Sequence, residues 1–276
     1  MSELPALARA IESLASSDPV LAQLIAAAPR CDLKPLLSGS PFEHLARAIA
    51  HQQLHGAAAA TILRRFIALY GPDDLFPTPQ QLLATPERAI RGAGFSASKL
   101  MALRDLADKS LSGVVPSMDE LATQPDTAII ERLTQVRGIG TWTVQMLLMF
   151  HLGRRDVLPI DDFGVRHGFR LAYGLRLMPK PKALAKFGER WAPHRSIAAW
   201  YLWRAVDLQR AASLPPVLRP APRMPRVGRA RRVPRNSGSK PLSGAAACAT
   251  PPPRSDARTQ KYRRPAPRSR APASKK

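Results

Sequence analysis

Hydrophobic residues repeat at helical spacing over most of the first 212 positions of the chain. One helix face follows the i, i+3, i+4, i+7 pattern through four apolar residues: Phe42, Leu45, Ala46 and Ile49. A second stretch repeats leucine at similar spacing before Gly113, at Leu100, Leu103 and Leu106. Runs in which polar and apolar residues alternate, as they do in strands, are scarce. The pattern therefore predicts an all-α fold.

Short capping motifs mark where several of these helices begin. Ser40 stands as a helix cap, Pro41 lies in the first turn and Glu43 is a capping-box partner. Similar starts follow at three further capping residues: Thr78, Thr85 and Ser117. The connections between these starts are short, so we expect about ten helices in one domain over residues 1–212.

Composition changes abruptly after residue 212. Thirteen of the 28 prolines lie from Pro215 onward, together with 17 Lys and Arg and a single acid, Asp256. Such a segment buries too little apolar surface to offset the chain entropy lost on folding. We expect residues 213–276 to form a disordered basic tail that is rich in Pro and Arg. This tail either tracks DNA phosphates loosely or serves as a solubilising extension.

Charge and cysteine content narrow the classes of function. The formal net charge of +22 indicates a polyanionic partner, most simply nucleic acid. Two cysteines, Cys31 and Cys248, are too few for a disulfide framework, a cysteine zinc site or a four-cysteine iron–sulfur cluster. The amino end shows no secretory signal pattern, and no apolar run is long enough to span a bilayer. We therefore expect a reducing, intracellular setting.

A glycine-rich turn, VRGIG, joins two apolar helical runs at residues 136–140. Gly138 and Gly140 let the backbone approach a ligand closely, and the helix that follows presents free N–H groups at its start. Such a helix start binds an anion, and with duplex DNA it would hold a phosphate without reading sequence. The same turn is also compatible with an ordinary corner, in which a glycine ends the first helix.

Two neighbouring carboxylates, Asp161 and Asp162, follow directly after Pro159 and Ile160. A helix is expected to begin there, and one carboxylate is needed as its cap. The other has no structural duty. It is therefore a candidate catalytic group in a cleft whose opposite wall is the glycine turn.

Together these segments resemble the helix-hairpin-helix (HhH-GPD) superfamily of DNA glycosylases, and within it the 3-methyladenine DNA glycosylase II branch. The resemblance extends from about Pro41 to Trp203 and rests on LTQVRGIGTWTVQ followed by VLPIDD. Asp162 lies 24 residues after Gly138, as in the family pattern. The resemblance implies two helical lobes with a DNA-binding cleft that contains the helix-hairpin-helix motif. It also implies that this chain lacks the β-rich amino-terminal domain of the best-known enzyme of the branch.

The resemblance assigns the catalytic role to Asp162 and a helix-capping role to Asp161. It places four residues in a pocket for the damaged base: Trp142, Trp203, Phe163 and Met146. Met146 stands where the best-known enzyme has a tyrosine, which leaves the base preference open. Trp142 also suits a hydrophobic cover for the hairpin, and Trp203 also suits a core position.

The resemblance further implies how the protein holds DNA. Gln53 and Leu54 match a wedge that fills the gap left by a flipped nucleotide, although Leu54 by itself would also suit the core. Phosphate contacts are implied at three hairpin residues: Gly138, Gly140 and Thr143. A structural Na⁺ or K⁺ is implied at three main-chain carbonyls: Thr134, Val136 and Gly138. No other cofactor is expected.

The implied activity is hydrolysis of the N-glycosidic bond of alkylated purines, of the 3-methyladenine and 7-methylguanine type, in double-stranded DNA. Trp142 stands where bifunctional members carry a Schiff-base lysine, so we expect an enzyme that leaves an abasic site without cutting the strand. A non-catalytic DNA-binding protein, or a glycosylase for another damaged base, remains an alternative. We expect a monomer in the cytoplasm at the nucleoid, or in the nucleus of a eukaryote.

Overall fold

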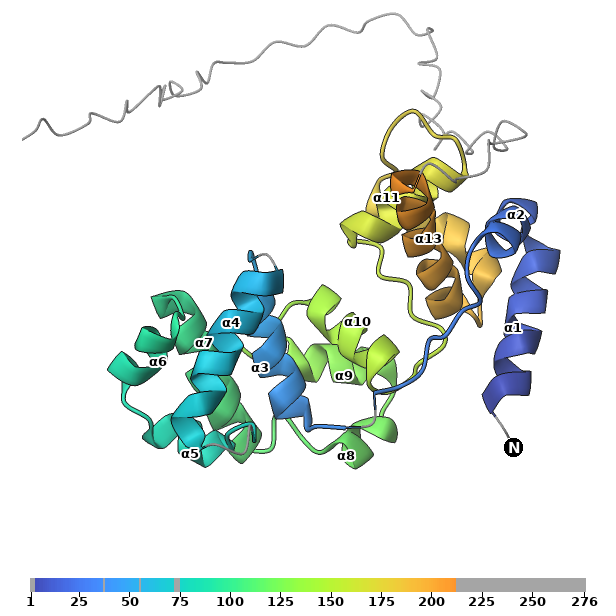
Figure 1. Cartoon of the computed structure of the whole chain (residues 1–276). Coiled ribbons are helices and arrows are strands. Elements are labelled where there is room, and N and C mark those ends of the chain that lie inside the picture. Colours follow the sequence, from blue (N-terminus) through green and yellow to red (C-terminus); the bar gives the residue numbers. More distant parts are fainter. Residues whose placement is uncertain (1–2, 37, 55, 72–74, 212–276) are drawn as a thin grey trace, which may run out of the picture. The chain divides into compact units, whose positions relative to one another are not determined.

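The computed structural model describes residues 3–36, 38–54, 56–71 and 75–211 (Figure 1). Regular structure within these ranges is entirely helical, which confirms the predicted all-α fold. The elements run in this order: α1 (Glu3–Ser17), α2 (Pro19–Ala27), α3 (Pro41–His51), α4 (Gly56–Ile67), η1 (Ala68–Tyr70), α5 (Pro79–Ala84), α6 (Glu87–Ala93), α7 (Ala97–Leu111), α8 (Met118–Ala122), α9 (Asp126–Leu133), α10 (Thr141–Phe150), α11 (Phe163–Ala172), α12 (Pro181–Gly188), η2 (Glu189–Trp191) and α13 (Arg195–Arg210).

Side-chain caps begin several helices where the sequence predicts them. The Ser40 hydroxyl accepts the N–H of Glu43 at 3.2 Å and starts α3. Thr78 and Gln81 form a complete capping box at α5, and the Ser117 hydroxyl caps α8 by accepting the N–H of Glu120. Local sequence therefore sets these helix starts.

The predicted cap at Thr85 is wrong. Its hydroxyl donates to the carbonyl of Gln81 at 2.7 Å and thereby ends α5, whereas Pro86 precedes α6 without any side-chain cap. The described helices also outnumber the ten expected, because elements as short as the five residues of α8 are too brief to show a hydrophobic repeat.

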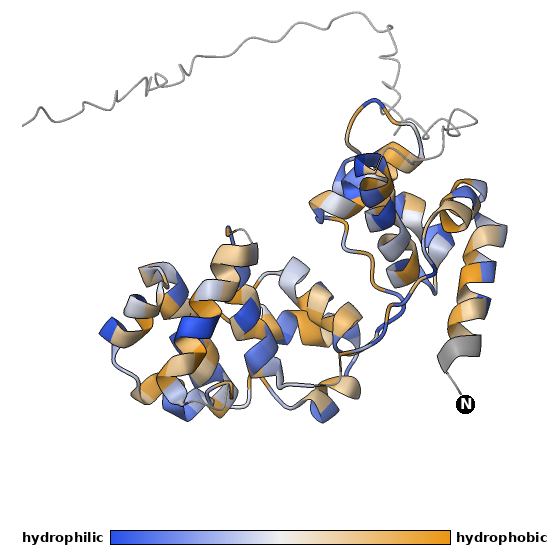
Figure 2. Ribbon diagram, in the orientation of Figure 1, coloured by the Kyte–Doolittle hydropathy of each residue, from blue (hydrophilic) through white to orange (hydrophobic). Residues whose placement is uncertain are grey.

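One group of helices, α3 to α10, packs around α3. Helix α3 contacts α4, α7 and α10, while α5 and α6 lie against α7 (Figure 1). Phe66 of α4 is fully buried and meets the rings of Phe76 and Phe95 with centroids 5.9 and 5.2 Å away. In Figure 2 the helices carry both hydrophobic and hydrophilic residues, as expected of amphipathic helices around a core.

A second group contains α1, α2, α11, α12 and α13, with α11 packed along α13. Buried Asp18 joins its members. Its carboxylate caps α2 through the N–H groups of Val20 and Leu21 and accepts the Tyr173 hydroxyl at 2.6 Å and the Trp191 indole N–H at 3.0 Å. The carboxylate thus has four donors, which satisfies a buried charge. Burial and the nearby Asp18 raise the pKa of Tyr173.

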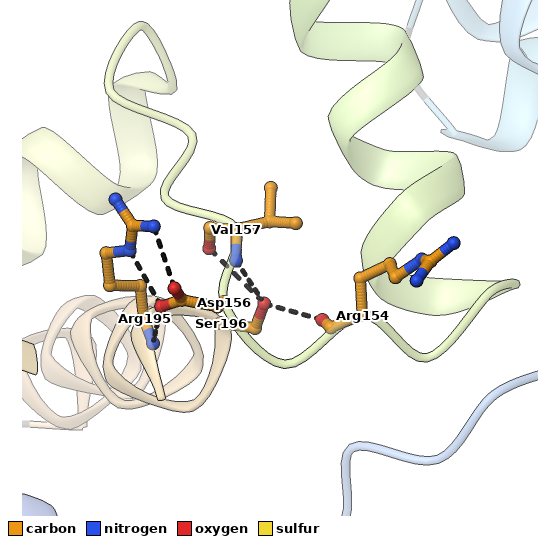
Figure 3. A network of polar contacts seen from close by, with 5 residues as sticks. All are labelled: Arg154, Asp156, Val157, Arg195 and Ser196. Atoms are coloured by element: carbon orange, nitrogen blue, oxygen red, sulfur yellow. Dashed lines mark hydrogen bonds and ion pairs between the residues drawn. The ribbon is translucent and has the colours of Figure 1, made fainter. Parts of the chain in front are cut away.

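Polar contacts at the start of α13 connect the two groups of helices (Figure 3). The buried Ser196 hydroxyl donates to the carbonyl of Arg154 at 2.7 Å and accepts the N–H of Val157 at 2.9 Å. Arg195 binds Asp156 through two N–H groups, at 2.7 and 2.8 Å. Burial raises the pKa of Asp156, but the bonds from Arg195 outweigh it and leave the pKa below its usual value. This network fixes the segment that leads from α10 to α11.

The described helices end with α13 at Arg210 and lie within one compact unit, Met1–Arg226. The predicted domain boundary at 212 and the predicted basic tail lie outside the described residues. No helix in the described ranges is both long and apolar enough to cross a membrane.

Candidate active site

Asp162 lies at the start of α11, where its carboxylate accepts three N–H groups. Trp142 donates its indole N–H to Oδ2 at 2.8 Å, and Trp203 donates to Oδ1 at 2.9 Å. The main-chain N–H of Val165 donates to Oδ1 at 2.7 Å. An ionised carboxylate has about four acceptor directions. About one direction at Oδ2 therefore remains for a water molecule or for a positive charge that develops nearby.

The capping role predicted for Asp161 is wrong, because Asp162 itself caps α11. Asp161 is exposed and makes no side-chain hydrogen bond within the described residues. Capping leaves part of the Asp162 carboxylate available, because its two oxygens have different partners. Oδ1 closes the first turn of the helix, whereas Oδ2 has only the Trp142 indole N–H as partner.

Two glycines allow α11 to approach α13 closely enough for this arrangement. A Cβ atom at Gly164 would lie 2.7 Å from Cδ1 of Trp203, and one at Gly168 would overlap the carbonyl oxygen of Leu202. Any larger residue would push α13 away from α11. Neither glycine was predicted from the sequence, although their four-residue spacing on one helix face is the signal of close helix packing.

Trp203 is held from both sides. Its ring stacks on Phe150 with centroids 5.8 Å apart and packs on the hydrophobic core, while its indole N–H reaches Asp162. Trp203 therefore packs on the core, as one of its two predicted roles requires, and also bonds to Asp162.

A cavity of about 480 Å³ lies beside the hairpin, within the size range of small-molecule pockets. Eight residues line it: Ala48, His51, Gln52, Gln53, Gly138, Trp142, Thr143 and Met146. Of the four residues predicted for a base pocket, Trp142 and Met146 are among them. Trp203 and Phe163 are not, and the Phe163 side chain is 68% exposed.

The turn after α3 carries the two predicted wedge residues. Gln53 lines the cavity and has φ +57°, the one positive φ of a non-glycine residue in the described chain. Such a conformation costs about 1–2 kcal/mol and needs support from its surroundings. Leu54 is 40% exposed, which excludes the core position considered for it.

Lys99 of α7 supplies support for this turn. Its ammonium donates to the carbonyls of Ala50 and Gln52, both at 2.7 Å, where the last carbonyls of α3 lack helical partners. Burial lowers the pKa of Lys99. The Lys99 ammonium thus holds the main chain just before Gln53 in place.

The hairpin places an uncapped helix start at the edge of the cavity. Helix α9 ends with Thr134 as its C-cap, so the interpretation in which a glycine ends this helix is wrong. Gly138 instead adopts φ +79° within the turn, and Gly140 is the N-cap of α10 without a side-chain cap. The first N–H groups of α10 are therefore open to an anion.

Two side chains from other helices hold the hairpin in place. The N–H of Arg137 donates to Asp105 at 2.7 Å, and the Gln52 side-chain amide donates to the carbonyl of Gly138 at 2.8 Å. Burial raises the pKa of Asp105, but bonds from Arg137 and Lys109 outweigh it and leave the pKa below its usual value. At the edge of the cavity, the turn after α3 and the hairpin are thus joined by a hydrogen bond.

Two of the three carbonyls predicted to bind a monovalent cation already accept hydrogen bonds. Gly138 O already accepts the Gln52 amide, and Val136 O accepts the N–H of Ile139 at 3.0 Å. A carbonyl has two lone pairs, so each could still take part, but the predicted set of three is not free. A cation at these carbonyls remains a proposal.

Three supporting residues were not predicted from sequence: Gln52, Lys99 and Gly164. Gln52 stands beside the predicted Gln53, but nothing in its sequence context distinguishes a wedge from its support. The partners of Lys99 lie 47 and 49 residues away, so no local pattern reveals them. Arg195 and Arg204 form ion pairs with Asp156 and Asp207.

The chain matches the family model described as "HhH-GPD superfamily base excision DNA repair protein" over residues 46–194. This range contains α4 to α12, the hairpin, and both Trp142 and Asp162. The chain belongs to the HhH-GPD superfamily of base excision DNA repair proteins.

Curated relatives narrow the likeness further. The chain is 42% identical over 168 residues to DNA-3-methyladenine glycosylase 1 of Schizosaccharomyces pombe, covering 61% of this chain and 73% of the relative. It is 32% identical over 202 residues to alkylbase DNA glycosidase-like protein mag2 of the same yeast, covering 73% of this chain and 95% of the relative.

Solved structures agree. The S. pombe 3-methyladenine DNA glycosylase in complex with abasic DNA matches with a TM-score of 0.64 and 38% identity, over 71% of this chain and 95% of that one. A DNA-3-methyladenine glycosidase from Bacillus halodurans matches with a TM-score of 0.66 and 34% identity, over 73% of this chain and 91% of that one. This chain is therefore similar in fold to these 3-methyladenine DNA glycosylases.

Proposed function

We propose that this protein is a monofunctional DNA glycosylase that removes alkylated purines, of the 3-methyladenine and 7-methylguanine type, from double-stranded DNA. The carboxylate of Asp162 carries the proposal. It is fixed by three N–H donors and retains about one open acceptor direction at Oδ2, beside the indole of Trp142.

Cleavage of a deoxyribose N-glycosidic bond develops positive charge on the sugar. A carboxylate that is already oriented stabilises this charge and orders the attacking water without reorganising during the reaction. The donors on Asp162 hold it in one orientation. In this proposal the first N–H groups of α10 hold the phosphate next to the sugar.

The target base must first leave the helix stack, at a cost of a few kcal/mol. Exposed Leu54 would occupy the space that the base leaves, and Gln53 would line the cavity that receives it. Purines alkylated at N3 or N7 are cationic or electron-poor. They stack favourably on an indole, by about 0.5–2 kcal/mol, and leave readily, so Trp142 and Met146 suffice for a selective but tolerant pocket.

Within the described residues, the hairpin position that would need a Schiff-base amine carries Trp142 instead. The ammonium of Lys99 is engaged by two carbonyls. The product is therefore an abasic site in an uncut strand. Hydrolysis by a carboxylate and water needs no cofactor, and we propose that one monomer acts on the duplex.

The test compares Asp162→Asn with Asp161→Asn, a neighbour that makes no side-chain hydrogen bond in the described chain. Both proteins are incubated with methylated DNA, and released bases are quantified. Asp162→Asn should lose at least about a hundredfold in rate, the usual effect of removing an electrostatic group from a catalytic site, and still bind abasic-site DNA. Asp161→Asn should keep its rate.

A panel of duplexes, each with one damaged base and treated with alkali afterwards, defines the substrate range. Release of uracil or an oxidised purine, but not of 3-methyladenine, would change the proposed substrate. Tight binding without release of any base would identify a non-catalytic DNA-binding protein and refute the proposal.

A further inference from the structure

The charge of the folded region is unevenly placed along the sequence. Residues 163–190 contain seven Lys and Arg and a single acid, Glu189. The rest of residues 1–214 contains 18 Lys and Arg and 18 Asp and Glu. The whole net positive charge of residues 1–214 therefore lies in one segment of 28 residues, which forms α11, α12 and the start of η2.

The seven cations of this segment have no carboxylate partner within the described residues: Arg166, Arg170, Arg176, Lys180, Lys182, Lys186 and Arg190. Three of them bind other groups. Arg166 donates to the carbonyl of Pro179, Arg170 lies 3.0 Å from His167, and Arg190 lies over the Phe187 ring at 3.9 Å. These three side chains are thus held in place, but no carboxylate neutralises their positive charge within the described residues.

The other four cations are exposed and make no side-chain hydrogen bond in the described chain: Arg176, Lys180, Lys182 and Lys186. Lys182 and Lys186 stand four residues apart on the outer side of α12, about 6 Å along its axis. The opposite side of α12 is buried through Leu184 and Phe187. Helix α12 therefore presents two neighbouring positive charges to solvent.

The same surface begins at the active site. Helix α11 starts at Asp162 and buries Val165, Gly168 and Phe169 against its neighbours, which leaves Arg170 on its other side. Burial and then the charges of Arg170 and Arg210 lower the pKa of His167, as expected on a positively charged face. In Figure 2 part of α11 is strongly hydrophilic. In the proposed function, a nucleotide bound at Asp162 lies at the start of α11.

We propose that α11, α12 and the segment between them form a second DNA-binding surface, which holds phosphates of the duplex outside the lesion. This inference rests on the proposed function for the position of the lesion. Helix α11 is about 15 Å long, which corresponds to about four base pairs of duplex. The hairpin fixes the damaged nucleotide, whereas this surface supplies affinity that does not depend on damage.

The test measures binding of undamaged duplex by the full-length protein over a range of salt concentrations. One variant, which we call the α12 variant, carries Arg176→Ala, Lys180→Ala, Lys182→Ala and Lys186→Ala. A control variant removes the same charge from exposed positions of α4 and α6: Arg64→Ala, Arg65→Ala, Arg88→Ala and Arg91→Ala. The 17 Lys and Arg from Pro215 onward are present in both variants and contribute equally.

Each lost phosphate contact lowers the slope of log K against log salt by about 0.9. We expect the α12 variant to lose about two units of slope or more and at least about tenfold in affinity, with the control close to the unmodified protein. Equal slopes for the two variants would show that the charge acts diffusely and would overturn the inference.

The rate of base release at saturating enzyme separates this inference from the proposed function. None of the four substituted residues contacts Asp162, so this rate should be unchanged in the α12 variant. If the unmodified protein releases no base but the slope still falls, only the proposed function fails. If it releases base and the slope is unaffected, only the second surface fails.

Discussion

The side-chain amide of Gln52 donates to the main-chain oxygen of Gly138 at 2.8 Å, and this bond joins the turn after α3 to the hairpin. In the proposed function the two segments act on different parts of the same nucleotide. One fills the space of the extruded base and the other holds its phosphate. The bond therefore fixes the separation of the turn and the hairpin, and with it the separation of the two sites that would contact the nucleotide.

Gln52→Ala should weaken base release more than DNA binding. The variant removes the link between turn and hairpin but leaves the N–H groups of α10 and Asp162 in place. We expect a fall of about tenfold in the single-turnover rate, since one hydrogen bond contributes about 0.5–1.5 kcal/mol. Gln124→Ala, whose amide bonds to Glu120 on an exposed surface, serves as a control and should match the unmodified rate. An unchanged rate in Gln52→Ala would show that the link has no catalytic value.

Lys99→Met should destabilise the protein and slow base release together. The substitution leaves the carbonyls of Ala50 and Gln52 without their donor, at a cost of about 1–3 kcal/mol. Urea unfolding measures the loss in stability, and single-turnover assays at a temperature where both proteins are folded measure the rate. Lys99→Arg retains a charged donor and should restore part of both. Equal rates for Lys99→Met and the unmodified protein would show that Lys99 stabilises α3 without positioning the turn.

Trp203→Phe should reduce the rate of base release by about ten- to a hundredfold with little effect on affinity for undamaged DNA. Phenylalanine keeps the stacking on Phe150 but removes an N–H donor from the carboxylate of Asp162, and bonds to charged groups contribute about 1.5–3 kcal/mol. Trp200→Phe is the matched control, because Trp200 is a buried tryptophan of the same helix that does not bond to Asp162. Similar rates for the two variants would contradict an orienting role for the indole.

Gly168→Ala should destabilise the fold by about 3 kcal/mol or more. A Cβ atom there would overlap the carbonyl oxygen of Leu202, so α11 and α13 would have to separate. Gly92→Ala in α6 tests the same change where no atom lies within 4 Å, and it should stabilise the protein by about 0.5–1 kcal/mol through helix propensity. Denaturant unfolding of both variants checks the opposite signs.

Stability should fall as the pH drops below about 6.5. His44 and His151 stack with ring centroids 3.5 Å apart, and burial lowers the pKa of both rings. The pKa of His44 is lowered further by His151, while Glu43 opposes this effect. The unfolded chain therefore binds protons that the folded chain refuses, and the free energy of unfolding decreases with falling pH.

Urea unfolding at pH 7.5 and pH 5.5 measures this decrease. The double variant His44→Gln/His151→Gln should show a smaller decrease than the unmodified protein. Exposed His51, with His51→Gln as its variant, controls for the loss of a histidine as such. The same decrease in all three proteins would rule out the stacked pair as its source.

Local sequence determined much of the fold. The caps at Ser40, Thr78 and Ser117 lie where short-range rules place them, because a cap needs only residues within one turn. The predicted cap at Thr85 was wrong for a related reason. The same hydroxyl can close the helix before it or open the one after it, and the sequence does not state which.

Site residues were predictable from the sequence where they belong to a motif. They were not predictable where their role depends on a partner that is distant in the sequence. Gly138 and Asp162 belong to a spaced pattern, whereas the bonds of Lys99 and Gln52 depend on how α3, α7 and the hairpin pack. The cap was wrongly assigned to Asp161 because the choice between two adjacent carboxylates depends on where the first turn of α11 begins, which the sequence does not show.

The groups that hold Asp162 are largely separate from the groups that line the cavity. Val165 and Trp203 orient the carboxylate, while Ala48, His51 and Met146 line the cavity proposed for the base, and Trp142 alone belongs to both sets. Substitutions at His51 or Met146 can thus alter which lesion is accepted while the bond-breaking step stays intact. A protein built this way can broaden or shift its repertoire of lesions one residue at a time.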